Sequence, residues 1–142
     1  MNVANNHIEI LPPSIGLMRS LKHLYVQNNK LEGLPETLGN DQLLLTLNAS
    51  DNVITELLGD LRKWRTMEVL LLARNEISQI PKSFKHLSNL HTFDVTDNQI
   101  VTASLPDGAG KVLKICNLAG NPWRLPKPGE EDKRSLITKL HR

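Results

Sequence analysis

The sequence predicts a solenoid of stacked repeats, and three observations support this fold class. An asparagine recurs every 23 residues without an insertion, aliphatic residues recur at fixed distances on both sides of it, and proline often follows. Only 4% of the 142 residues are aromatic, so the core must be built mainly from leucine, isoleucine and valine, which favours many small layers. The periodic asparagines are Asn6, Asn29, Asn52, Asn75, Asn98 and Asn121.

The aliphatic positions around each asparagine define the repeat unit, L-x-x-L-x-L-x-x-N-x-L-x-x-L. Its L-x-L segment alternates with a period of two, which predicts a short strand with leucines on one side and the intervening residues on the other. One unit cannot bury its apolar side alone, so neighbouring units must stack. The residues two positions after the asparagine are Ile8, Leu31, Ile54, Ile77, Ile100 and Trp123, and those three positions before it are Val3, Val26, Ala49, Leu72, Val95 and Leu118.

The asparagine itself lies where the chain turns inward out of the strand. Its side-chain amide both donates and accepts hydrogen bonds, so we expect it to satisfy buried backbone groups that the turn leaves unpaired. Proline after the turn, as in Leu11-Pro12, Leu34-Pro35 and Ile80-Pro81, presets the backbone at the start of the following segment.

These residues resemble the leucine-rich-repeat family, in the subclass with 23-residue units found in many intracellular signalling and scaffold proteins. The resemblance covers essentially the whole chain. It implies an α/β fold: a right-handed solenoid with short parallel strands on the concave face and short helical or irregular segments on the convex face. About six units span residues 1–126.

The two ends of the array differ. Residues 127–142 are expected to form a C-terminal cap, with a short helix over 130–141 that has acidic residues at its start and basic residues at its end. Residues 102–110 break the apolar pattern and predict an irregular loop, which is either a degenerate turn or a second contact site. The first unit starts at Met1 in mid-strand, and an open sheet edge invites pairing. We therefore expect either a piece of a longer parent or self-association through the uncapped N-terminal edge.

Composition limits the environment and the partner. The single cysteine, Cys116, cannot form an internal disulfide and is expected inside the stack, which favours a reducing, cytoplasmic location. No apolar run is long enough to span a membrane. Residues 111–142 hold eight lysines and arginines against three acidic residues, which is a steering patch for an acidic partner or a solvated end cap. With a net charge of only +2, nucleic acid is the less favoured partner.

The residues needed for catalysis are not grouped in the sequence. His91 and Asp94 share a predicted strand region, but no serine or cysteine is paired with them, and the glycine-containing stretch at 108–111 lacks the spacing of a phosphate loop. We therefore expect no enzyme activity, no cofactor and no metal.

Outward-facing strand positions are the candidate binding site. Leu71 and Val69 are apolar where water is expected, which predicts a hot spot for a protein partner. The candidate residues on the concave face are Tyr25, Asn48, Val69, Leu71, Asp94 and Asn117, flanked by the charged column Asp51, Arg74 and Asp97. The chain is thus expected to bind another protein as an adaptor or scaffold, or to be the recognition segment of a larger signalling or cytoskeletal protein.

Overall fold

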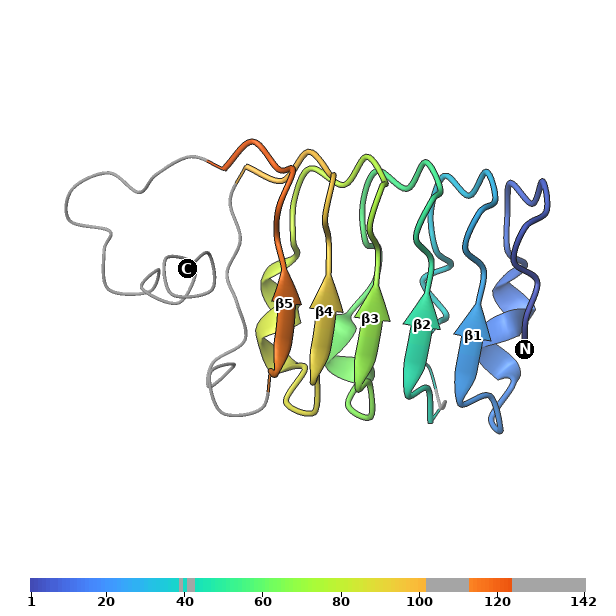
Figure 1. Cartoon of the computed structure of the whole chain (residues 1–142). Helices are drawn as coiled ribbons and strands as arrows, with labels where there is room; N and C mark the ends of the chain where they lie inside the picture. Colours follow the sequence, from blue (N-terminus) through green and yellow to red (C-terminus); the bar gives the residue numbers. More distant parts are fainter. Residues whose placement is uncertain (39, 41–42, 102–112, 124–142) are drawn as a thin grey trace.

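The structure is a computed structural model that describes residues 1–38, 40, 43–101 and 113–123. Within these residues, five three-residue strands form one parallel sheet in chain order (Figure 1). Each strand residue lies beside the residue 23 positions further on, as His23 does beside Thr46. The strands are β1 (His23–Tyr25), β2 (Thr46–Asn48), β3 (Val69–Leu71), β4 (Thr92–Asp94) and β5 (Ile115–Asn117).

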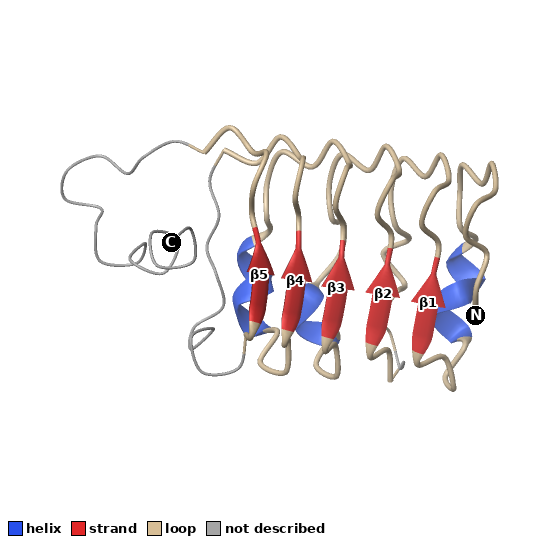
Figure 2. Ribbon diagram, in the orientation of Figure 1, coloured by secondary structure: helices blue, strands red, loops and turns tan. Residues whose placement is uncertain are grey.

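Short 3-10 helices lie on the other side of the coils from the sheet, as Figure 2 shows. They are η1 (Pro13–Leu17), η2 (Leu61–Lys63) and η3 (Lys82–His86). The residues before η1 and η3 are Pro12 and Pro81, both extended, so the proline fixes the angle at which the chain enters the helix. The predicted solenoid of stacked repeats, with short parallel strands on one face and short helices on the other, is confirmed.

The core lies between the sheet and the helices, and repeat position decides which side chains enter it. The middle residue of β1 to β4 is fully buried: Leu24, Leu47, Leu70 and Phe93. On the helix side a second buried column runs Ile15, Leu38, Leu61 and Phe84. The rings of Phe84 and Phe93 meet with centroids 4.5 Å apart, which ties η3 to β4. Each coil thus buries its apolar side chains against those of the next coil.

The periodic asparagines hydrogen-bond adjacent coils to one another. Asn75 is a buried example: its Nδ2 donates to the carbonyls of Ala49 and Leu72, each at 3.0 Å, and of Ala73 at 3.3 Å. Its Oδ1 accepts from the backbone N–H of Ile54 in the preceding coil at 3.0 Å. One amide therefore satisfies groups in two coils, at a depth where unpaired backbone groups are costly.

The same geometry repeats along the row with increasing exposure toward the ends. Asn52, Asn75 and Asn98 are buried, Asn29 and Asn121 are half-buried, and Asn6 is exposed. Exposed Asn6 donates only to carbonyls of its own coil, those of Val3 and Ala4. Interior asparagines thus join coils, whereas Asn6 supports only its own turn.

A left-handed backbone turn precedes each asparagine. Asn5, Asn28, Asp51, Arg74 and Asp97 all have φ between 53° and 58°, and Gly120 has φ 68°. Asparagine, aspartate and glycine tolerate this region best, so Arg74 is the unusual member of the column. The turn directs each of these side chains to the edge of the strand face.

The N-terminal residues add to the sheet edge. Asn2 forms a parallel bridge with Tyr25, and the Met1 amino group donates to the carbonyl of His23 at 2.8 Å. Beside them, the first coil leaves Ile10 and Leu17 exposed. The predicted loop at 102–110 and the predicted cap at 127–142 lie outside the described residues. None of the helices in the described part is long and apolar enough to cross a bilayer.

Candidate protein-binding surface

The strand face is the surface made by the first and third residues of each strand and by the turn that follows. In β2, β3 and β4 these residues are half-buried, and the residue between them is buried. Sequential strands are in register without a shift, so equivalent side chains form rows across the sheet. In a row, neighbouring side chains are about 4.8 Å apart, which is close enough for one ligand to contact several strands.

The apolar centre of the strand face is the outer side of β3. Val69 and Leu71 stand there, half-buried, while the flanking positions in β2 and β4 are polar. Tyr25 lies in the same row as Leu71 but is separated from it by Asn48 of β2. The structure therefore places an aliphatic pair in the middle of the sheet and the tyrosine two strands away.

Two of the candidate side chains cap the backbone of their own turn. Asn48 Oδ1 accepts from the backbone N–H of Ser50 at 3.1 Å, and Asp94 Oδ1 accepts from that of Thr96 at 2.9 Å. Asp94 Oδ2 also accepts from Nδ2 of Asn117 at 3.1 Å. These bonds fix both side chains in place, so they offer a partner a preorganised polar edge.

This hydrogen-bond network keeps the carboxyl group of Asp94 ionised. Burial alone would raise the pKa of its carboxyl, but hydrogen bonds from Thr96 and Asn117, together with the nearby charge of Arg74, outweigh burial and lower the pKa below its usual value. Asp94 is therefore negatively charged at neutral pH, next to the apolar pair on β3.

Arg74 forms an ion pair with only one of its two neighbours in the charged column. Its guanidinium holds the carboxylate of Asp51 from the preceding coil through two hydrogen bonds, one of them Nη2 to Oδ2 at 2.7 Å. This pairing lowers the pKa of Asp51, and the charges of Asp94 and Asp97 also act on Arg74. Asp97 is exposed, and a Cβ at Gly120 would collide with its carboxylate. The turn edge of the strand face is therefore acidic overall, since one arginine faces three aspartates.

Cys116 in β5 packs against the core and is half-buried. Burial, with a smaller contribution from the charge of Asp94, raises the pKa of its thiol to about 11. The thiol is therefore protonated at neutral pH and is a poor nucleophile.

The repeat pattern predicts Asp51, Arg74 and Asp97 as an interface column but does not by itself indicate their backbone role. The signal was present, because the position before each periodic asparagine reads Asn5, Asn28, Asp51, Arg74, Asp97 and Gly120, the residue types of a left-handed turn with one exception. The turn bonds of Asn48 and Asp94 were equally readable from an Asx residue two positions before Ser or Thr. Within the described residues, no group of three or more His, Cys, Asp or Glu side chains could hold a metal ion.

The chain carries a leucine-rich repeat in its sequence and has the leucine-rich-repeat fold. A sequence model of the family described as Leucine Rich Repeat matches residues 20–40, a segment that includes β1 and the first interior asparagine. A solved leucine-rich-repeat protein of Leptospira interrogans superimposes with a TM-score of 0.81 over 99% of this chain and 34% of its own, at 24% identity. That likeness supports the fold alone, and the 23-residue spacing of the present chain is consistent with it.

Among curated proteins, the chain is similar to podocan-like protein 1 of Mus musculus, with 28% identity over 83% of this chain and 26% of the relative. Keratocan of Mus musculus shares 28% identity over 87% of this chain and 43% of the relative. An adenylate cyclase of Schizosaccharomyces pombe shares 28% identity, but the match covers only 7% of that protein. The chain thus spans less than half the length of each of these relatives, and the likenesses fit a protein-interaction module.

Proposed function

We propose that the chain binds a partner protein through the strand face, in an adaptor or scaffold role. One observation carries the proposal: Val69 and Leu71 present aliphatic surface in the centre of the sheet, on a strand flanked by polar residues. The fold does not require apolar residues there, since the equivalent positions in β2 and β4 are Thr46, Asn48, Thr92 and Asp94. An apolar centre with a polar rim is the usual anatomy of a protein interface.

The polar rim around Val69 and Leu71 indicates which chemical groups the proposed partner carries. Asp94 and Asp97 lie on the coil after Leu71, and the only cation of the turn column, Arg74, is already engaged by Asp51. A matching partner segment therefore carries an apolar side chain for Leu71 and a lysine or arginine for the acidic edge. Charges at such an edge mainly accelerate association, while the buried apolar contact sets the dissociation rate.

Leu71→Arg tests the placement. Arginine fits the half-exposed position without entering the core but adds charge and bulk at the centre of the strand face. Capture experiments with wild-type and variant chains, read by quantitative mass spectrometry, should show partners that the variant loses; their affinity should fall by about a hundredfold, as for a hot-spot residue.

Leu58→Arg is the matched control. Leu58 is 40% exposed and occupies the repeat position that Pro12 and Pro81 hold before their helices, away from the strand face. The control should retain the same partners. Equal retention by both variants, with both chains folded, would contradict binding through the strand face.

Two earlier predictions stay predictions. The cytoplasmic location rests on the single cysteine, and self-association rests on the N-terminal sheet edge. Light scattering of the purified chain over a range of concentrations tests the second, since a monomer at every concentration would exclude it.

A further inference from the structure

The strand face carries polar and apolar residues on alternate strands. In β2 and β4 the first and third strand residues and the second residue after the strand repeat the same polar chemistry, since residues 46–50 read TLNAS and residues 92–96 read TFDVT. The odd-numbered strands depart from this pattern. Their apolar or aromatic residues on the strand face are Tyr25 in β1, Val69 and Leu71 in β3, and Ile115 in β5. A two-strand period therefore overlies the 23-residue repeat.

From β1 to β4 the same alternation decides whether one backbone donor is paired. The third residue of β2 is Asn48 and that of β4 is Asp94, and each Oδ1 accepts from the backbone N–H two positions later. Because these side chains belong to the strand face, that N–H is reached from the strand face. β1 and β3 have no Asn or Asp at this position. The corresponding N–H groups, those of Gln27 and Ala73, make no hydrogen bond within the part of the chain that the structure describes.

These unpaired groups are shielded from water, which makes them costly in the free chain. Ala73 is 4% exposed and Gln27 is half-buried. The side-chain Oε1 of Gln27 is buried as well, and it too has no hydrogen-bond partner among the described residues. The coils that carry Tyr25 and Leu71 thus each hold backbone or side-chain groups that a bound segment can satisfy.

The spacing of these two coils selects the conformation of a segment that crosses them. Strands that are two apart in a sheet are separated by about 9.6 Å, twice the usual strand spacing. A polyproline II segment has three residues per turn, so the same face of it returns about every 9.3 Å. An α-helix returns the same face after seven residues, or about 10.5 Å. An extended β-strand does so after two residues, or about 6.6 Å. The polyproline II repeat is the closest match.

Backbone hydrogen bonding supports the same choice. Within an α-helix the carbonyl and N–H groups bond to one another, so a crossing helix has none to offer the strand face. A polyproline II segment makes no internal hydrogen bonds. Its carbonyls are therefore free to accept from the N–H groups of Gln27 and Ala73, and its own N–H groups are free to donate to Oε1 of Gln27.

We propose that the partner binds through a segment in the polyproline II conformation, which crosses the strands with an apolar side chain at every third residue. This inference rests on the proposed function, since it specifies the partner segment for the same surface. One face of the segment packs on Tyr25 and Leu71. A second face, a third of a turn away, carries the lysine or arginine that meets Asp94 and Asp97. The third face points to solvent and holds proline, which favours this conformation in its neighbours.

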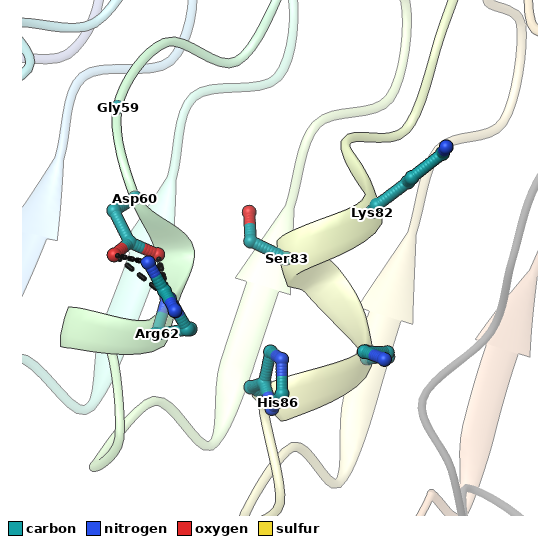
Figure 3. A pocket seen from close by; sticks show the side chains of 7 residues that line it. Gly59, Asp60, Arg62, Lys82, Ser83 and His86 are labelled. Atoms are coloured by element: carbon teal, nitrogen blue, oxygen red, sulfur yellow. Dashed lines mark hydrogen bonds and ion pairs between the residues drawn. The ribbon is translucent and has the colours of Figure 1, made fainter.

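A hollow on the helix side of the solenoid does not fit such a segment. It is shallow and lies between η2 and η3, where Asp60 and Arg62 face Ser83 and His86 (Figure 3). Asp60 and Arg62 are paired with each other, and no aliphatic side chain lines the hollow. The apolar contacts that the segment needs are on the strand face.

The first experiment titrates the isotope-labelled chain with a synthetic peptide of four Leu-Pro-Lys repeats and follows backbone amide resonances. Leucine then recurs at every third residue of a polyproline II segment. The amides of Gln27 and Ala73 should shift and saturate. Two control peptides should bind about tenfold more weakly. One has the same composition in an order that removes the leucine spacing, and the other is an α-helical peptide of equal charge with leucine at every seventh residue.

Leu71→Asn tests the surface itself. It gives the coil of β3 the side chain that Asn48 supplies in β2, so it removes the apolar contact and provides an acceptor for the N–H of Ala73. The variant should bind the Leu-Pro-Lys peptide about tenfold more weakly. In the free variant, hydrogen exchange at Ala73 should slow to the rate of Ser50. Leu58→Asn makes the same change at a 40% exposed position away from the strand face and should alter neither measurement.

Three results would overturn the proposal: no shifts at Gln27 and Ala73, equal binding of either control peptide, or unchanged peptide affinity in Leu71→Asn. The proposed function fails by a different result. If Leu71→Arg loses its captured partners while the Leu-Pro-Lys peptide does not bind, strand-face binding stands and only the polyproline II segment is rejected. If Leu71→Arg keeps every partner, strand-face binding is rejected and the segment with it.

Discussion

η1 and η3 occupy the same place in their repeats, three units apart, yet they share only serine at the second position. Their sequences are PSIGL and KSFKH. The entering residues, Pro12 and Pro81, have nearly the same backbone angles, φ −66° and ψ 143° against φ −63° and ψ 146°. One buried side chain per helix and the preceding proline therefore suffice to specify the 3-10 helix. The exposed positions are free to differ.

Gly16 limits this freedom. A Cβ at Gly16 would lie 2.6 Å from the Cβ of Thr37 in the next coil and still nearer to the carbonyl oxygen of Thr37, closer than real contacts allow. In η3 the equivalent position holds Lys85, which is exposed. The basic surface of η3 therefore cannot be extended to η1 at every position, because Gly16 lies too close to Thr37 to accept a side chain.

The largest expected effect lies in the shared buried column. Phe84→Ala should lower the free energy of unfolding by about 3–5 kcal/mol, because it removes a fully buried ring that contacts Phe93. Ile15→Ala should cost about 2–4 kcal/mol for the same reason with a smaller side chain. Urea denaturation measures both. A cost below about 1 kcal/mol for Phe84→Ala would mean that this column does not hold the coils together.

An intermediate effect is expected where the two helices differ in packing. Gly16→Ala should destabilise the chain by about 1–3 kcal/mol, since the added methyl group has no room beside Thr37. Leu17→Lys is the neighbouring control, because Leu17 is 77% exposed, and it should change stability by less than about 0.5 kcal/mol. If thermal unfolding ranks the two variants equally, the close contact of the first coils is not a constraint.

Much of the scaffold followed from the sequence because buried positions repeat. A residue type that must fill the same place in every coil appears at a fixed spacing, as Leu24, Leu47 and Leu70 do, and so the strands and their register were predictable. The asparagine bonds were predictable for the same reason, since each amide meets the same backbone groups in each coil.

The surface was less predictable because its residues do not repeat. Arg74 was assigned to the binding column, but its bond to Asp51 depends on a side-chain conformation that spacing does not encode. The shallow hollow between η2 and η3 was not predicted, because net charge along the chain does not show which residues share a repeat position, as Arg62 and Lys85 do. Only the structure shows that η2 and η3 face each other across this hollow.

The division between buried positions that specify the fold and exposed positions that specify binding can be tested in a single variant. Lys82→Pro/Lys85→Ala/His86→Leu gives η3 an uncharged surface like that of η1 while it retains Phe84. We expect a free energy of unfolding in urea within about 1 kcal/mol of the wild-type value. A loss of several kcal/mol would contradict it, because the exposed positions of η3 would then be part of what holds the solenoid together.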